Sequence, residues 1–467
     1  MRSLPSVGDI LVMPAVVAAS AGIADIYRTA VVREAIDGER ARLRRDGGTA
    51  DVARIVDAAC GELRRLMGAK LRPVINATGV ILHTNLGRAP VSAAAAEAMR
   101  AAASSYVPLE FAVESGERGG RMGELAALFR ALTGCEAALV VNNNAAATML
   151  VLAATVAPGR TDVLVSRSEA VEIGGSFRIP DILRQSGATL VDVGTTNRTY
   201  LRDYEQAITE QTAAILKVHT SNFVLSGFVH TTPAADLVPL GERHGVPMID
   251  DLGSGALVDT RQFGLAAEPM FQTSVASGAH LTCASGDKLL GGPHAGIILG
   301  RKEWVAKCAA HPFARAFRAD KATLAGLAET LRHYLRDEHT EHIPVWRMIA
   351  AGPDFLRSRC ARWAADLEGA GLICEIRPSS ATVGGGSLPG EMLASYALTI
   401  SVSDVRDAGS SLQSFARALR LGTPGIIPRI EGDRLWLDAR TVAPDDDDAL
   451  IATVRAAWQS LAAASAD

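Results

Sequence analysis

Seven short apolar runs, separated by longer stretches with helical spacing, constrain the fold of this chain more than any other feature. They lie between residues 137 and 300 and read AALVV, DVLVS, ATLVDV, AAILKVH, PMIDD, HLTCAS and AGIILG. Runs of this length that alternate with helices are typical of a mostly parallel β-sheet whose two faces are both covered. The pattern therefore predicts a large α/β domain over residues 73–322, built on a mostly parallel seven-stranded sheet.

Two regions with different patterns flank this sheet. Residues 1–72 carry apolar positions at helical spacing and predict a helical N-terminal domain. From residue 323 a long helical pattern leads into the strand patterns YALTISVS and DRLWLDAR. These predict a small C-terminal α/β domain over residues 323–467. The acidic run from Asp445 to Asp448 precedes a further helical pattern, and we expect it to lie at the positive end of a helix dipole.

The composition and charge indicate the cellular compartment and the kinds of ligand that the protein can bind. The chain has a formal net charge of −4 and six scattered cysteines without a CxxC pair. This cysteine usage predicts a reducing, cytoplasmic setting and no metal site. The apolar run over residues 10–24 is too short to cross a bilayer and contains Pro14, so we expect no membrane segment. A polyanion would have to be bound by a local basic surface.

Polar residues follow the predicted strands at the sheet edge where open α/β sheets bind their ligands. Asn142, Asn143 and Asn144 stand between the first strand and an alanine-rich helix. The free N–H groups of such a helix can hold a phosphate, and small residues such as Ala145 let it approach closely. One asparagine is most simply a helix cap, but three exceed what a cap needs.

Two acids and a lysine complete this constellation. Asp250 and Asp251 end a buried strand, where a carboxylate needs a cationic partner. Lys288 follows another strand in SGDKLLGGP, although lysine is usually a solvated surface residue. A lysine amine at this edge can form a Schiff base with an aldehyde cofactor. Phosphate turn, aspartate and lysine together predict a pyridoxal-phosphate enzyme with the aminotransferase fold, fold type I.

Long stretches of the sequence also resemble the bacterial selenocysteine synthases, the L-seryl-tRNA(Sec) selenium transferases. They are RPVINATGVILHTNLGRAP, NNNAAA, VEIGGSFRIPDI, VGTTNRT, KVHTSNF, DLGSG, SGDKLLGGP and RADKATLAGL. The resemblance begins near Arg72 and reaches the C-terminus. It implies a cytoplasmic homo-oligomer, a ring of dimers, that acts in selenoprotein synthesis. The implied reaction converts L-seryl-tRNA(Sec) to L-selenocysteinyl-tRNA(Sec) with selenophosphate, through an aminoacrylyl intermediate bound to pyridoxal 5'-phosphate.

The resemblance also implies roles for individual residues. Lys288 would be the Schiff-base lysine and the catalytic base, and Asp251 of the DLGSG motif would face the pyridine nitrogen. The further cofactor contacts would be Asn143, Asn144, Ala145 and Ser285, and the cations for selenophosphate would be Arg88, Arg315 and Arg318. Pro312 predicts the start of a helix that would present the last two arginines on one face.

Some residues and one alternative function stay open at this point. Asp250 stands where the family needs no acid, His294 replaces the usual Gln, and Pro428 alters the setting of Arg429. A related pyridoxal-phosphate lyase, acting on a small amino acid or amino sugar phosphate without tRNA, would share the lysine core. A catalytically inactive tRNA-binding protein would lack it. The N-terminal arginines favour RNA binding over a merely solvated helix face; they are Arg40, Arg42, Arg44, Arg45, Arg64 and Arg65.

Overall fold

The protein is described by a computed structural model that covers residues 4–68, 71–175, 177–401 and 411–464. The chain divides into two compact units, Met1–Pro73 and Val74–Asp467. The first unit consists of four helices, α1 (Val7–Leu11), α2 (Pro14–Ala19), α3 (Asp25–Asp46) and α4 (Val52–Met67). They enclose a core of their own, which includes Ile10, Val32, Ile55 and Leu63. The helical character expected of this region is therefore present.

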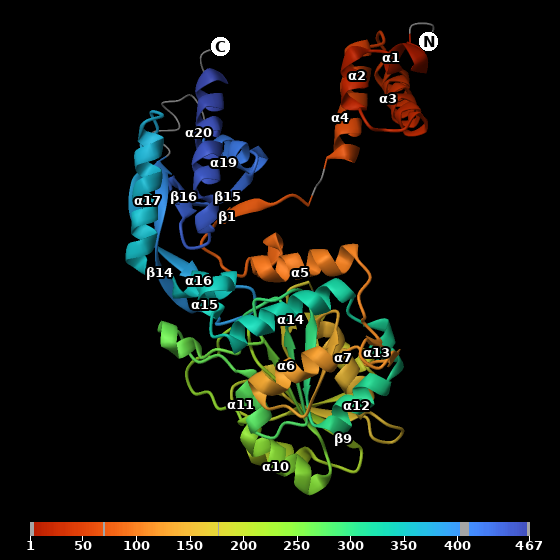
Figure 1. Cartoon of the computed structure of the whole chain (residues 1–467), viewed down its shortest axis with the longest axis vertical. Helices are drawn as coiled ribbons and strands as arrows, with labels where there is room; N and C mark the ends of the chain where they lie inside the picture. The colour runs from red at the N-terminus through yellow and green to blue at the C-terminus, as the bar shows by residue number, and fades with distance from the viewer. Residues whose placement is uncertain (1–3, 69–70, 176, 402–410, 465–467) are drawn as a thin grey trace. The chain divides into compact units, whose positions relative to one another are not determined.

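The second unit is built around a seven-stranded sheet (Figure 1). Its strands in spatial order are β4 (Ala137–Val141), β12 (Gly296–Gly300), β11 (Leu281–Ser285), β10 (Met248–Gly253), β9 (Thr212–Val218), β5 (Asp162–Ser166) and β8 (Thr189–Val193). β12 runs antiparallel to both of its neighbours, and the remaining pairs are parallel. The predicted mostly parallel sheet is thus confirmed.

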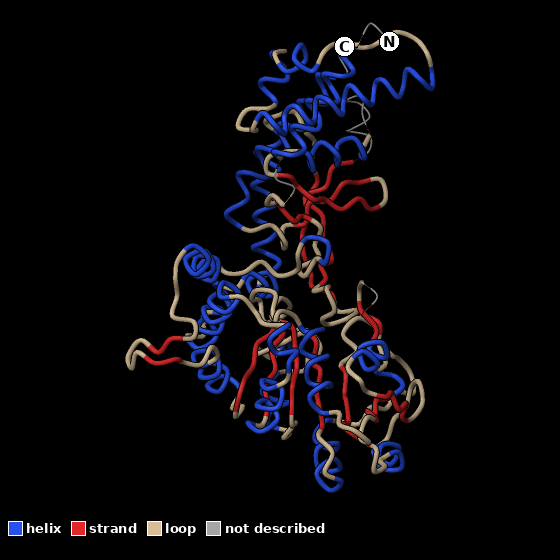
Figure 2. Tube along the Cα trace, turned by 90° about the vertical axis from the view of Figure 1, so that its right-hand side faces the viewer, coloured by secondary structure: helices blue, strands red, loops and turns tan. Residues whose placement is uncertain are grey.

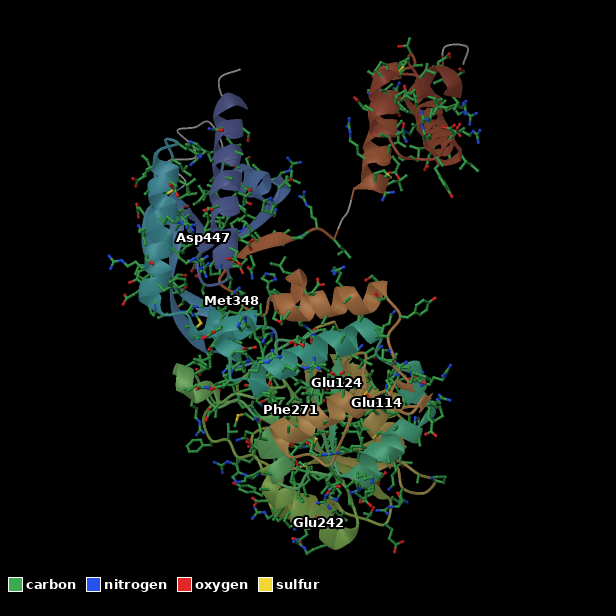
Figure 3. All side chains as sticks on the ribbon, viewed as in Figure 1. Glu114, Glu124, Glu242, Phe271, Met348 and Asp447 are labelled. Atoms are coloured by element: carbon green, nitrogen blue, oxygen red, sulfur yellow. The ribbon has the colours of Figure 1, made fainter. Side chains whose placement is uncertain are left out.

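Helices cover both faces of this sheet, as the continuous apolar character of its strands requires. The helices α7 (Asn144–Thr155), α8 (Ile179–Gln185) and α12 (Lys302–Ala310) share a core with one face. On the other face lie α6 (Gly123–Thr133), α9 (Leu201–Ala207), α10 (Ala234–His244), α11 (Phe271–Ala276) and α14 (Lys321–Leu335). Phe271, labelled in Figure 3, packs edge-on against Phe129 there. α5 (Ala93–Ser104) lies along α14 (Figure 1).

The same unit contains a five-stranded sheet, and Figure 2 shows its strands in red above the larger sheet. Its order is β1 (Val74–Ala77), β15 (Gly425–Glu431), β16 (Arg434–Asp438), β14 (Met392–Ser401) and β13 (Glu375–Thr382). β1 pairs with β15 in parallel, so the first strand of the unit joins the C-terminal sheet. Of the pattern YALTISVS, residues 402–403 lie outside the described residues.

Three helices pack against this sheet, α17 (Pro353–Glu368), α19 (Leu412–Leu421) and α20 (Asp447–Ala464). The acidic run lies at the start of α20, as predicted. Its Asp447, labelled in Figure 3, accepts a 3.1 Å hydrogen bond at Oδ2 from Nε of the buried Arg359. This complete ion pair joins α17 to α20. No helix in the described part of the chain is long and apolar enough to cross a membrane.

Candidate functional site

Asp250 and Asp251 face opposite sides of the large sheet, because side chains alternate along a strand. Asp251 lies on the α7 side, where the Asn144 amide donates to its Oδ1 at 2.9 Å and the Thr148 hydroxyl to its Oδ2 at 2.8 Å. The backbone N–H of Gly253 donates to Oδ1 at 3.2 Å. Burial raises the pKa of Asp251, because it penalises the charged form, and this effect outweighs the hydrogen bonds, which lower that pKa. Among the described residues no salt bridge reaches this carboxylate.

Asn143 and Asn144, at the start of α7, have different roles. The Asn143 side chain caps the helix by accepting a 2.8 Å hydrogen bond from the N–H of Ala146. Asn144, the first helical residue, ties the helix to Asp251 instead. Ala145 follows it in the first turn, whose N–H groups have no partner within the helix. The edge of the sheet therefore carries both a carboxylate and an anion-binding helix end.

Lys288 lies in the loop between β11 and β12, and only 4% of it is exposed. Its Nζ makes one long hydrogen bond, of 3.4 Å, to the carbonyl oxygen of Gly386. A Cβ atom at Gly386 would lie 3.2 Å from Nζ, and one at Gly253 would lie 3.8 Å from it. Glycine at these positions leaves free space beside the amine. Burial, followed by the charge of Arg88, lowers the pKa of Lys288, which favours the neutral, nucleophilic amine.

Sequence reasoning missed two residues that border this amine. Gly386 ends a run of three glycines with positive φ, a backbone that other residues rarely adopt. Ser221 is fully buried, and its hydroxyl has no hydrogen-bond partner. A Cβ at Gly386 would lie 3.5 Å from the Ser221 hydroxyl, so serine and lysine face the same space. Ser221 lies in KVHTSNF, just after the end of β9, and this position at a strand end could have identified it as a site residue.

Arg88 reaches the same loop from a distant part of the sequence. It follows the short helix η1 (Thr84–Leu86), and its Nη1 lies 3.0 Å from Oδ2 of Asp287. His294 approaches the same oxygen with Nδ1 at 2.6 Å. Burial acts to raise the pKa of Asp287, but the His294 contact and the Arg88 charge outweigh it and hold that pKa below its usual value. Asp287 is therefore a carboxylate between two basic groups, next to Lys288 in the chain.

Asp250 lies on the opposite face, and its hydrogen-bond partner there is Ser274 at 2.6 Å. Burial raises its pKa to about 6. It lines a cavity of about 630 Å³ together with Lys217, whose Nζ is 2.8 Å from the Glu169 carboxylate. The structure thus separates the role of Asp250 from that of Asp251.

The two predicted donor arginines do not share a helix. α13 (Pro312–Ala316) begins at Pro312 as predicted, but it ends before Arg318, so the prediction of one common helix face was wrong. The backbone of Arg318 instead bridges Val141 at the end of β4. Arg315 and Arg318 are exposed and line a cavity of about 380 Å³. The residues around this cavity include Glu110 but not Lys288, Asp251 or Arg88.

Two further sequence candidates have clear structural positions. Ser285 is the buried last residue of β11, three positions before Lys288. Arg429 lies on β15, where it forms a 3.3 Å ion pair with Glu431, a 3.2 Å hydrogen bond to Ser379 and a cation–π contact with Trp436. All three partners belong to the small sheet, so Arg429 has a structural reason for its position.

Four of the six N-terminal arginines pair with acids of the same unit. The pairs are Arg40–Asp37, Arg42–Glu39, Arg45–Asp46 and Arg65–Glu62. Arg42 also donates to the carbonyl of Thr49 at 3.0 Å, which ties α3 to the loop that follows it. Arg44 and Arg64 are exposed in the last turns of α3 and α4, where a cation suits the helix dipole.

Comparisons with known proteins show which family this chain is similar to. Residues 74–443 match the SelA family model, described as L-seryl-tRNA selenium transferase. The L-seryl-tRNA(Sec) selenium transferase of Moorella thermoacetica is 43% identical over 464 residues, which cover 96% of this chain and 95% of that protein. The Haemophilus ducreyi enzyme of the same name is 48% identical over 388 residues, or 82% of this chain and 83% of that protein.

A solved structure shows the same fold at lower sequence identity. It is that of a D-glucosaminate-6-phosphate ammonia-lyase, which superimposes with a TM-score of 0.58 at 24% identity. The match covers 87% of this chain and 99% of that one. This likeness concerns the fold of the chain.

Proposed function

Since this chain belongs to the L-seryl-tRNA selenium transferase family, we propose how its own residues carry out that reaction. The enzyme depends on pyridoxal 5'-phosphate and converts L-seryl-tRNA(Sec) to L-selenocysteinyl-tRNA(Sec). Selenophosphate is the proposed selenium donor, the cytoplasm the proposed location and a ring of dimers the proposed assembly. The observation that carries the proposal is the family match over residues 74–443, which include Lys288, Asp251 and Arg88.

The residues of the site fit the cofactor. Asp251 is a buried carboxylate without a salt-bridge partner among the described residues, and a cationic pyridine nitrogen would supply one. Lys288 is a buried amine with one long hydrogen bond and free space beside it, which suits a covalent bond to the aldehyde. The first turn of α7, with Asn143, Asn144 and Ala145, would hold the phosphate, and Ser285 borders the same strand ends.

The chain's own groups then divide the reaction between them. When bound, pyridoxal phosphate draws electrons away from the serine Cα, so that its proton becomes acidic. The amine of Lys288, with its lowered pKa, removes that proton and returns one to the departing hydroxyl. Asn144 and Thr148 hold the Asp251 carboxylate in orientation, and Asp251 would pair with the pyridine nitrogen of the cofactor and favour its protonated form. Burial of both groups excludes water that would compete for the same proton.

Arginines supply the binding of an anionic donor. Arg88 contacts Asp287, the residue before Lys288 in the chain, and its positive charge helps to lower the pKa of Lys288. Arg315 and Arg318 lie together around a second cavity, and their planar guanidinium groups suit the oxygens of a phosphate-bearing donor. We assign all three to selenophosphate. Arginines of the N-terminal unit, above all Arg44 and Arg64, are the proposed contacts to the tRNA phosphates.

The decisive test is conversion of defined substrates by the purified protein. Seryl-tRNA(Sec) and selenophosphate should yield selenocysteine on the tRNA, detected by mass spectrometry after hydrolysis of the ester. Ordinary seryl-tRNA should give far less product, and Lys288→Ala should give none. Release of ammonia from an amino sugar phosphate or a small amino acid, with no reaction on the tRNA, would establish the lyase alternative instead.

A further inference from the structure

The Asp287 carboxylate has two basic partners that differ in chemistry and in exposure. Oδ2 lies 3.0 Å from Nη1 of Arg88 and 2.6 Å from Nδ1 of His294. The side chain of Asp287 is 8% exposed, whereas that of His294 is 58% exposed. His294 therefore connects a buried carboxylate, adjacent to Lys288 in the chain, with the solvent.

The two partners respond differently to pH. An arginine side chain carries its positive charge throughout the working pH range. Histidine changes its charge near neutral pH. Among the described residues, Asp287 and Arg88 are the charged groups that act on His294. The hydrogen bond that His294 donates to the Asp287 carboxylate raises the pKa of His294, and burial together with the charge of Arg88 opposes that rise.

Charge balance within this group of three residues depends on His294. With His294 neutral, the Asp287 carboxylate fully compensates the charge of Arg88. With His294 protonated, both cations share one carboxylate, and the group carries a net positive charge. An anion that approaches Arg88 meets more positive potential in the second state.

We propose that His294 is a positioning residue that holds Asp287 in place and sets how much of the Arg88 charge is available to the anionic selenium donor. The proposal rests on the proposed function, in which Arg88 contacts that donor. It predicts that donor binding strengthens as the pH falls through the titration of His294. The chemical step on Lys288 needs no change in the charge of His294.

The test compares the KM for selenophosphate from pH 6 to pH 9 in the wild type, His294→Gln and His294→Arg. We expect the wild-type KM to rise by about 5-fold over this range, since one unit charge at about 4 Å in water contributes that much. The glutamine variant should show a high KM and the arginine variant a low KM, each changing only with the ionisation of the donor itself. kcat should stay nearly constant. A ratio of wild-type to glutamine KM that does not change with pH would overturn the proposal.

A second measurement uses no substrate and separates this proposal from the proposed function. The pKa of His294 is higher in the folded than in the unfolded protein. Protonated His294 therefore stabilises the folded state at a pH below its unfolded-state pKa, and this stabilisation is lost as the pH rises through its folded-state pKa. The Tm of the wild type should therefore exceed that of His294→Gln at pH 6 and approach it at pH 9. A pH-independent difference in Tm would show that the contact between His294 and Asp287 does not form.

The matched control is His244→Gln, at the exposed end of α10. It should leave both the KM and Tm profiles unchanged. Failure of all variants and of the wild type to act on seryl-tRNA would overturn the proposed function, while the Tm profiles would still decide whether His294 holds Asp287.

Discussion

Lys288 and Asp251 differ from the buried ion pair of Arg359 and Asp447 in what surrounds them. Arg359 and Asp447 are also buried, but they form a complete ion pair with each other. Lys217 is likewise paired, with Glu169. Lys288 instead has one long hydrogen bond and two glycines beside its amine. Buried groups left incomplete in this way mark a site for a ligand, whereas complete pairs mark a contact that holds elements together.

Replacing the lysine gives the most direct test at the scale of one residue. In Lys288→Ala we expect the covalently held cofactor to be lost and activity to fall by at least about 100-fold, the lower bound for a general acid–base group. Borohydride reduction followed by mass spectrometry measures the covalent link in each protein. The exposed Lys302→Ala is the matched control and should keep both properties. Retention of the reducible link in Lys288→Ala would assign it to another lysine.

From the raised pKa of Asp250 we expect the stability of the protein to change with pH, whether or not Asp250 takes part in catalysis. Its folded pKa of about 6 exceeds 3.8, the usual value for an aspartate, so folding favours its protonated form. The stability of the protein should therefore fall as the pH rises from 3.8 to about 6. The groups that act on Asp250 there are Ser274, Lys217, Glu169 and Asp251.

The variant Asp250→Asn should remove this part of the fall, because the amide cannot ionise. Urea unfolding at several pH values between 4 and 7 measures the effect. The exposed Asp433→Asn should leave the wild-type profile unchanged. An unchanged profile in Asp250→Asn would mean that the carboxyl group is already ionised at the lower end of this range.

At the scale of elements, the early end of α13 lets the backbone of Arg318 reach the end of β4. α7 starts at the end of β4, and Arg318 bridges the last residue of the same strand. The early end of α13 makes this possible, since a helix continued through Arg318 could not form the bridge. Arg318 thereby reaches the end of the sheet that also presents the first turn of α7.

Changing either donor arginine tests this arrangement. Arg315→Ala or Arg318→Ala should raise the KM for selenophosphate by about 10-fold, as expected for the loss of a hydrogen bond to a charged group. The visible absorbance of the bound cofactor should stay as in the wild type. Arg100→Ala, on the exposed face of α5, is the matched control. Loss of the absorbance instead would place these arginines at the cofactor.

On the scale of the whole molecule, the residues proposed to bind RNA and those proposed for catalysis belong to different compact units. Lys288, Asp251 and Arg88 lie in the unit Val74–Asp467, and the arginines proposed to bind RNA lie in Met1–Pro73. The first unit has its own core, so changes on its surface need not disturb the catalytic site. Arg44 and Arg64 suit such a test better than Arg42, which holds Glu39 and Thr49 in place.

The double variant Arg44→Gln/Arg64→Gln should bind tRNA(Sec) more weakly and with a flatter dependence on salt. Each lost phosphate contact should reduce the slope of log K against log salt by about 0.7 to 0.9. A salt titration of binding measures this, with Arg28→Gln, which changes an arginine already paired with Asp25, as the control. Equal slopes for wild type and double variant would move the RNA surface elsewhere, and cofactor binding should be equal in both.

Local pattern was enough to predict the sheet and the main chemical groups. The seven apolar runs correspond to the seven strands, because the alternation of strand and helix is a local property of the chain. Lys288, the pair Asp250 and Asp251, and the asparagines 142–144 could be predicted as site residues because each group stands at the end of a strand, and ends of parallel strands meet at one edge. The choice of Asp251 over Asp250 came from the resemblance of DLGSG to the family motif. Motif resemblance then supplied the family, which the comparisons confirm.

Contacts between distant segments could be decided only by the tertiary structure. Asp250 and Asp251 are equivalent in the sequence, and the pleat of β10 sends them to opposite faces with different partners. Ser221 and Gly386 border Lys288 from segments far away in the chain. Arg88 and His294 meet on Asp287 in the same way. Local sequence patterns carry no information about such contacts, because the contacts depend on how the loops at the sheet edge pack against one another.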